Sequence, residues 1–128
     1  MGNNRDDSKT ILIIEDDITI AQMYRLKLEL DGHKVEIALD GRSGLKAISY
    51  VKPDLVLLDI MMPRMNGDEV LKRIRSNPAT ANLSVLVLTN IGNEELRNRM
   101  KKMGVTSYIQ KSDLTPKRVL AKINEVLM

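Results

Sequence analysis

Leu55-Val56-Leu57-Leu58-Asp59 is a run of four apolar residues that ends directly in a carboxylate. A short, uninterrupted apolar run of this kind is typical of a strand that is buried on both faces of a sheet. A second fully apolar run, Ile11–Ile14, is followed by the acidic segment Glu15–Asp17. We therefore expect both runs to be central strands that place acidic side chains at their carboxyl ends.

Strands and helices alternate outward from these two runs. Short apolar runs, mostly rich in β-branched residues, predict five strands: Thr10–Ile14, Val35–Ala38, Leu55–Leu58, Val85–Leu88 and Ser107–Ile109. Apolar residues at helical spacing follow each strand: Ile20, Met23, Tyr24 and Leu28; Leu45 and Ile48; Val70, Leu71 and Ile74; Leu96, Met100 and Met103; Leu120, Ile123 and Leu127. This alternation predicts an α/β fold with a parallel sheet and helices on both of its faces.

Local sequence signals mark the ends of several elements. Asp40-Gly41 indicates a turn, Gly104 a helix C-cap, and Thr115-Pro116 an N-cap followed by a first-turn proline. Asp17 is interpreted as a helix N-cap, and His33 as a structural residue at a helix end.

The chain has the size and composition of one domain. Its 128 residues are 43% hydrophobic, enough to form a core. Residues 1–8 are polar and are predicted to be a flexible tail, which leaves residues 9–128 as the domain. The sequence contains neither a long apolar stretch nor a basic segment followed by an apolar run, so we predict no membrane helix and no secretory signal. A cytoplasmic protein is expected, in agreement with the absence of cysteine.

The charge balance argues against nucleic acid as the main partner. The net charge is only +3, and aromatic residues make up 2% of the chain, too few for base-stacking surfaces. Four basic residues fall on one predicted helix, and we interpret them as a solvated face: Arg97, Arg99, Lys101 and Lys102. We expect this domain to bind neither nucleic acid nor membrane directly.

Polar side chains follow four of the predicted strands. The first strand runs into Glu15–Asp17, the third into Asp59, the fourth into Thr89 and the fifth into Gln110-Lys111. The carboxyl ends of parallel strands share one edge of the sheet, and α/β proteins bind ligands beyond that edge. The sequence therefore predicts that these groups form one site.

The chemistry of this site points to a divalent cation. Clustered carboxylates repel one another unless a cation lies between them, and Mg²⁺ prefers carboxylate, water and phosphate oxygens. Asp16 and Asp59 suit direct coordination together with a backbone carbonyl, while Glu15 would hold a coordinated water. A carboxylate can also act as a nucleophile and form an acyl phosphate. Lys111 would then supply a positive charge, and Thr89 a hydroxyl donor.

The motifs resemble those of the receiver domain of bacterial two-component response regulators, the chemotaxis-regulator-like domains among them. The resemblance spans about Thr10 to Met128 and rests on four segments: Ile13–Asp17, Asp59–Gly67 (DIMMPRMNG), Leu88-Thr89 and Tyr108–Lys111. It implies a flavodoxin-like, doubly wound fold with a five-stranded parallel sheet in the order 2-1-3-4-5.

The resemblance implies a phosphorelay switch rather than an enzyme, with at most slow self-dephosphorylation. Asp59 would accept a phosphoryl group from a sensor histidine kinase or a histidine phosphotransfer protein. Mg²⁺ would contact Asp16, Asp59 and the backbone carbonyl of Met61, with Glu15 acting through water. Lys111 would pair with Asp59 or with its phosphate.

The same resemblance implies how the switch would act on its surroundings. Thr89 would hydrogen-bond the phosphoryl oxygen, and Tyr108 would turn inward as Thr89 moves. These movements would change the surface formed by the fourth helix, the fifth strand and the fifth helix. That surface would contact a downstream protein target, and a phosphorylation-dependent dimer could form.

Three residues depart from the family pattern. Ser112 follows Lys111 where the family usually has a proline, often across a cis peptide; a non-proline cis bond costs about 2.5–4 kcal/mol, so a trans bond and a different loop are expected. Asn90 stands where the family favours a small residue, which predicts reduced access to the phosphoryl group and an altered phosphorylation lifetime. Glu15 replaces the commoner aspartate and should keep an outer-sphere role.

Two other interpretations stay open. The first is a non-phosphorylated pseudo-receiver that signals through protein contacts alone. The second is a magnesium-dependent phosphatase with an aspartyl-phosphate intermediate, which would need a second acid where Met61 stands. Nucleotide binding is disfavoured, because no Gly-rich loop follows the first strand.

Overall fold

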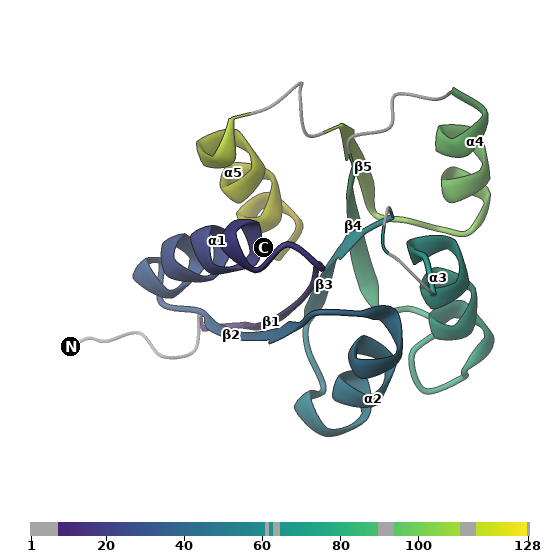
Figure 1. Cartoon of the computed structure of the whole chain (residues 1–128), viewed down its shortest axis with the longest axis horizontal. Coiled ribbons are helices and arrows are strands. Elements are labelled where there is room, and N and C mark those ends of the chain that lie inside the picture. The colour runs from purple at the N-terminus through teal and green to yellow at the C-terminus, as the bar shows by residue number, and fades with distance from the viewer. Residues whose placement is uncertain (1–7, 61, 63–64, 90–93, 111–114, 128) are drawn as a thin grey trace.

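The protein is described by a computed structural model that covers residues 8–60, 62, 65–89, 94–110 and 115–127. Strands and helices alternate along the chain (Figure 1). The strands are β1 (Thr10–Ile14), β2 (Lys34–Ala38), β3 (Leu55–Asp59), β4 (Ser84–Thr89) and β5 (Ser107–Gln110). The helices are α1 (Ile18–Leu30), α2 (Gly41–Val51), α3 (Gly67–Ser76), α4 (Glu94–Lys102) and α5 (Pro116–Leu127). The predicted alternation is confirmed.

The strands form one parallel sheet in the order β2-β1-β3-β4-β5, as the resemblance implied. Several strands are slightly longer than the apolar runs predicted. In particular, Asp59, Thr89 and Gln110 are the last residues of their strands rather than the first residues after them. Asp59 pairs with Leu88, and Thr89 pairs with Gln110. Strand pairing uses backbone N–H and C=O groups, so it does not stop where the side chains become polar.

Two helical layers cover the sheet, α1 and α5 on one face and α2, α3 and α4 on the other (Figure 1). Alternate residues of a strand point to opposite faces. In β1, for example, Ile11 and Ile13 pack against α1 and α5, whereas Leu12 and Ile14 pack on the side of α2 and α3. Both faces are buried, which explains why β1 and β3 are apolar at consecutive positions.

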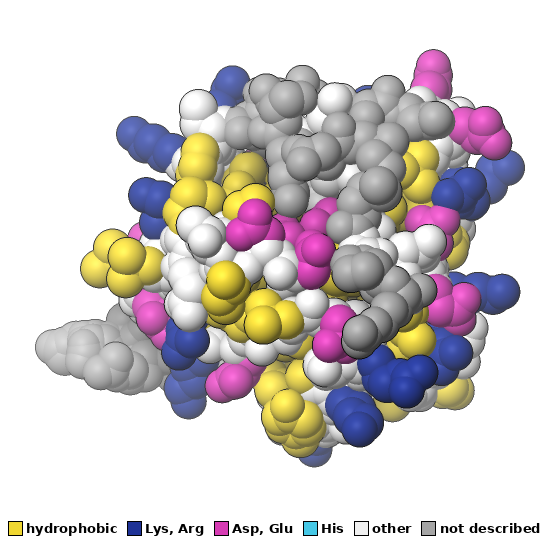
Figure 2. All heavy atoms as spheres, viewed as in Figure 1, with side chains coloured by type: hydrophobic (Ala, Val, Ile, Leu, Met, Phe, Trp, Pro, Cys, Tyr) yellow, Lys and Arg dark blue, Asp and Glu magenta, His cyan; other side chains and the backbone are white. Residues whose placement is uncertain are grey.

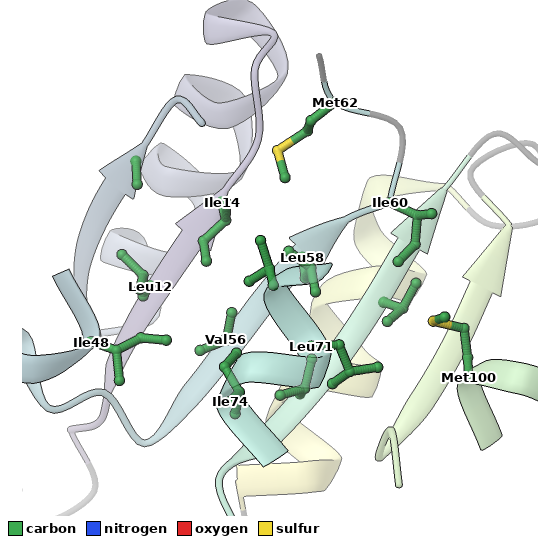
Figure 3. Packing of buried hydrophobic residues seen from close by; sticks show 14 of the residues in the cluster. Leu12, Ile14, Ile48, Val56, Leu58, Ile60, Met62, Leu71, Ile74 and Met100 are labelled. Atoms are coloured by element: carbon green, nitrogen blue, oxygen red, sulfur yellow. The ribbon is translucent and has the colours of Figure 1, made fainter. Parts of the chain in front are cut away.

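The larger core lies under α2, α3 and α4 (Figure 3). Side chains from the helices point toward the strands. The labelled residues of this layer include Ile48 of α2, Leu71 and Ile74 of α3, Met100 of α4, and Leu12, Ile14, Val56 and Leu58 of the sheet. Met62 packs at the upper end of the same cluster, close to the carboxyl ends of the strands (Figure 3). The methionine is therefore a packing residue at that edge.

Most of the predicted end signals are confirmed. Asp17 caps α1, Thr115 Oγ1 accepts a hydrogen bond from the Arg118 amide at the start of α5, and Gly104 follows α4 with a φ of +73°. The turn predicted at Asp40-Gly41 lies where β2 passes into α2: residues 39–40 bend the chain, and Gly41 begins the helix. Asp40 is the N-cap of α2 and accepts a hydrogen bond from the Ser43 amide, because the side chain of aspartate serves turns and helix starts alike.

His33 has the structural role predicted for it. Its Nδ1 accepts a hydrogen bond from the Lys9 amide at 3.3 Å, and its Nε2 lies 2.8 Å from Asn124 Oδ1 on α5. The ring thus ties the start of β1 and the end of α1 to α5. Of the tail predicted at residues 1–8, only Ser8 is described, and its hydroxyl donates to the Gly32 carbonyl. No helix within the described ranges is both long and apolar enough to span a bilayer.

Candidate metal and phosphoryl site

Three carboxylates meet at the carboxyl edge of the two central strands. The β1–β3 register pairs Ile14 with Leu58, so Glu15 and Asp59 come at the next step of each strand. One carboxylate oxygen from each of Glu15, Asp16 and Asp59 lies within 4.8 Å of the others. We call these three residues the acidic cluster. Glu15 and Asp59 are buried, with relative exposures of 4% and 5%, whereas Asp16 is open to solvent.

The backbone around β1 orients the acidic cluster. The Glu15 amide donates to the Ala38 carbonyl at 3.0 Å, which continues the sheet ladder for one residue past the strand. The Glu15 carboxylate accepts a hydrogen bond from the Asp17 amide at 3.1 Å. Asp17 Oδ1 instead accepts from the Thr19 and Ile20 amides of α1. The three consecutive acids therefore have different roles: Glu15 and Asp16 belong to the acidic cluster, whereas Asp17 caps the start of α1.

Gly67, the first residue of α3, lies against the backbone at the end of β3. The Gly67 amide donates to the Ile60 carbonyl at 2.9 Å. A Cβ on Gly67 would lie 2.6 Å from the Ile60 Cα and 2.8 Å from the Asp59 carbonyl oxygen. Only glycine fits this approach without a backbone shift. The sequence contained Gly67 within a motif, but its contact with the backbone beside Asp59 is evident only from the folded chain.

Thr89 and Tyr108 lie on neighbouring strands at the same edge. The β4–β5 register pairs Val87 with Tyr108, and Thr89 comes two residues after Val87. Side chains two apart on a strand share a face, so Thr89 is expected on the face where Val87 and Tyr108 pack. Thr89 is fully buried, and Tyr108 is partly buried.

Two arginines on opposite flanks of α4 contact residues near this edge, one on β5 and one on α3. The Arg97 guanidinium carbon lies 5.3 Å from the centre of the Tyr108 ring, a cation–π geometry. Arg99 Nη2 lies 2.5 Å from Asp68 Oδ2 at the start of α3. Burial raises the pKa of the Tyr108 phenol; the positive charge of Arg97 lowers it, and the negative charge of Asp68 raises it. The four basic residues of α4 are exposed, as predicted, but they do not share one face.

Several predicted site residues lie outside the described part of the chain. These are Lys111, Met61 as a carbonyl ligand, and the departures Asn90 and Ser112. Their roles, and the trans bond expected between Lys111 and Ser112, stay predictions. Sequence reasoning did not identify Asp68, Arg97 or Arg99 as neighbours of the site, because only the fold brings α3, α4 and β5 together.

The surface around the site is electrostatically divided (Figure 2). Acidic side chains gather near the middle of the face shown, and Lys and Arg side chains stand mostly around its periphery. The acidic cluster offers oxygen ligands alone, which suits a hard cation such as Mg²⁺ better than a transition metal that prefers nitrogen or sulfur. A buried carboxylate beside such a cation is also a suitable nucleophile for phosphorus.

The fold and the acidic edge define a doubly wound α/β protein whose ligand edge carries carboxylates. A family model described as the response regulator receiver domain matches residues 11–124. The chain therefore belongs to the receiver domain family of response regulators, which act in two-component signalling.

Individual relatives agree with this assignment. The chain is 33% identical over 120 residues to the phosphate regulon transcriptional regulatory protein PhoB of Escherichia coli, covering 94% of this chain and 52% of PhoB. It is 33% identical over 117 residues to the DNA-binding dual master transcriptional regulator RpaA of Synechocystis, covering 91% of this chain and 48% of RpaA. The chain thus spans about half the length of these curated relatives.

Solved structures show the same architecture over nearly whole chains. The chemotaxis protein CheY4 of Vibrio cholerae superposes with a TM-score of 0.86 at 29% identity, covering 93% of this chain and 98% of CheY4. A CheY-like response regulator receiver domain protein of Methanospirillum hungatei gives 0.85 at 32% identity, covering 93% of each chain.

Proposed function

We propose that this chain is a phosphoacceptor switch in which Asp59 receives a phosphoryl group from a histidine kinase or a histidine phosphotransfer protein. The observation that carries the proposal is the acidic cluster, in which oxygens of Glu15, Asp16 and Asp59 from two different strands lie within 4.8 Å of one another. Two of these carboxylates are almost completely buried, an arrangement that is costly for a fold unless a cation compensates it.

The chemistry follows from the position of Asp59 at the end of β3. A carboxylate oxygen of Asp59 attacks the phosphorus of a phosphohistidine; a P–O bond forms, the P–N bond breaks, and the imidazole leaves with the bonding electron pair. Mg²⁺, when bound, neutralises charge on the phosphoryl oxygens. Asp16, Asp59 and the Met61 carbonyl would hold it, with Glu15 acting through a water molecule. Lys111 would supply a further positive charge.

The response to phosphorylation is proposed to pass through Thr89 and Tyr108. The Thr89 hydroxyl would donate a hydrogen bond to a phosphoryl oxygen, and Tyr108 would turn inward as Thr89 moves. The placement of both residues on adjacent strands supports this coupling. The surface formed by α4, β5 and α5 would then change, which is a local electrostatic event biasing a two-state element.

The partners belong to the proposal as well. A kinase or phosphotransfer protein would donate the phosphoryl group, and a downstream protein would bind the switched surface. We propose no catalytic turnover beyond slow self-dephosphorylation. The cytoplasmic location expected from the sequence stays a prediction.

The decisive test is phosphorylation by acetyl phosphate with and without Mg²⁺, followed by intact mass and peptide mapping. We expect one phosphoryl group per chain, on Asp59, and only with Mg²⁺. Asp59→Asn should abolish it. Asp17→Asn is the matched control, because it removes a negative charge next to the cluster while asparagine still caps α1.

Each other result has a defined meaning. Failure of the wild type to incorporate phosphate would favour the pseudo-receiver alternative. Stable incorporation at another residue would refute the role of Asp59. Rapid release of phosphate over many turnovers from a small phosphoester would favour the phosphatase instead.

A further inference from the structure

Positive charge is concentrated on the two helices that flank strand β5. Helix α4 carries four basic and two acidic residues, and α5 carries three basic and one acidic residue, so together they have a charge of 7 − 3 = +4. Strand β5 has no charged side chain. The whole chain has a net charge of only +3, so the rest of the chain sums to −1. The charge is therefore segregated rather than spread over the surface.

The α4 side of this region faces β5. Strand β5 stands at the end of the sheet order, and α4 and α5 lie on opposite faces beside it (Figure 1). The contact of Arg97 with the Tyr108 ring shows which flank of α4 turns toward the strand. Lys101 follows Arg97 by one helical turn and is exposed on the same flank. Arg99 lies on the other flank, where Asp68 binds it.

The α5 side contributes two more cations. Asn124 contacts His33 and Asp31 and so marks the flank of α5 that turns toward α1. Helical spacing puts Arg118 and Lys122 on the opposite flank, toward the β5 end of the sheet. We call Arg97, Lys101, Arg118 and Lys122 the basic edge.

Two carboxylates lie near the four cations of the basic edge, Glu94 three residues before Arg97 on α4 and Glu125 on α5. Lys122 pairs with Glu125 at 3.7 Å on the helix surface, an exposed contact of little energetic weight. Within the described ranges, no carboxylate forms a salt bridge with Arg97, Lys101 or Arg118. The positive potential of the basic edge would raise the rate of encounter with an anionic partner.

We infer that the basic edge docks an acidic segment of a partner protein. A second copy in a two-fold arrangement would place the same basic surface against itself, which is repulsive. Tyr108 is the only aromatic residue in α4, β5 and α5, so the surface lacks the stacking platform that single-stranded nucleic acid prefers. The inference rests on the proposed function, which makes the surface of α4, β5 and α5 the binding surface for a downstream protein. It adds that the segment bound there is acidic.

The test maps binding on the unphosphorylated, isotope-labelled chain by NMR. The probes are a synthetic peptide of Glu and Leu, its counterpart with Lys in place of Glu, and a short single-stranded DNA. We expect only the acidic peptide to bind well, to shift amides of α4, β5 and α5, and to bind more weakly as salt increases. The double variant Lys101→Glu, Lys122→Glu should weaken binding about fivefold or more. The control Lys46→Glu, Lys72→Glu makes the same charge change on exposed positions of α2 and α3 and should bind normally.

Three outcomes would overturn the inference: tighter binding of the DNA at the same surface, self-association through it in sedimentation, or equal losses in both double variants. Circular dichroism of the variants checks that they are folded. Because the assay needs no phosphorylation, its failure is separable from a failure of Asp59 to accept phosphate.

Discussion

Arg97 on α4 covers the ring of Tyr108 on β5, with 5.3 Å between the guanidinium carbon and the ring centre. The receiver resemblance makes Tyr108 the residue that responds to phosphorylation, and the Arg97 contact joins α4 directly to it. Burial, Arg97 and Asp68 together set the pKa of the phenol. The pKa of Tyr108 therefore reports on its contact with α4.

We predict that the two charges move the pKa of Tyr108 in opposite directions. Arg97→Gln should raise that pKa, because it removes a positive charge that stabilises the phenolate. Asp68→Asn should lower it, because it removes a negative charge. NMR titration of chain labelled at the tyrosine ring carbons measures both shifts.

The same pKa predicts how stability depends on pH in the alkaline range. Because the folded pKa of Tyr108 is raised above its ordinary value of 10.0, the unfolded chain loses this proton first. The contribution of Tyr108 to stability is thus complete below the unfolded pKa and is lost as the pH rises through the folded one. Urea unfolding should show that the free energy of unfolding falls less steeply with rising pH in Tyr108→Phe than in the wild type. An unchanged slope would contradict the burial of the phenol.

Removal of one acid from the cluster should have opposite effects with and without metal. In EDTA, Asp16→Asn should raise the free energy of unfolding, because it relieves repulsion among the three carboxylates. In Mg²⁺, the wild type should gain about 2.7 kcal/mol at a concentration one hundred times its Kd, and the variant should gain much less. Thermal unfolding monitored by circular dichroism measures both effects. If Asp17→Asn behaves in the same way, general charge rather than the acidic cluster is responsible.

A side chain at Gly67 should disturb the site through the backbone. Gly67→Ala would place a Cβ 2.6 Å from the Ile60 Cα, so we expect a loss of about 1–3 kcal/mol in the free energy of unfolding and slower phosphorylation of Asp59. Gly32→Ala is the control: its φ of +91° makes alanine cost about 1–2 kcal/mol, but no atom lies within 4 Å of the new Cβ. If both variants lose similar stability but only Gly67→Ala is phosphorylated more slowly, the close approach of Gly67 to the backbone beside Asp59 matters for the site.

Arg75 should be the arginine of α3 that stabilises the fold. Its guanidinium donates hydrogen bonds to the carbonyls of Leu83, Met103 and Gly104 at 2.8–2.9 Å, and burial lowers its pKa. Lysine cannot reproduce three divergent donors of the guanidinium, so Arg75→Lys should cost about 1.5–3 kcal/mol in urea unfolding. Arg73→Lys alters an exposed pair with Glu69 and should cost less than about 0.5 kcal/mol. Equal losses of unfolding free energy in the two variants would show that the hydrogen bonds of Arg75 do not stabilise the fold more than the exposed pair of Arg73.

The order and type of elements could be predicted because they depend on local patterns. The run at Leu55–Leu58 needs no information from elsewhere to be identified as a buried strand, and the same is true of Ile11–Ile14. The strand ends could not be predicted from apolar runs, since backbone pairing extends past the last apolar residue to Asp59 and Thr89. At Asp40-Gly41 the sequence marked the change of direction after β2 but not the capping of α2 by Asp40, because one side chain suits both a turn and a helix start.

The sequence by itself determined the parallel α/β alternation and the acids at the carboxyl ends of β1 and β3, because period, polarity and propensity are properties of neighbouring residues. Only the tertiary structure decided which distant side chains meet. The approach of Gly67 to Asp59 and the contacts of Arg97 with Tyr108 and of Arg99 with Asp68 depend on how helices pack on the sheet. Such contacts join residues far apart in the chain, and their geometry is set by the packing of the whole core rather than by any local pattern.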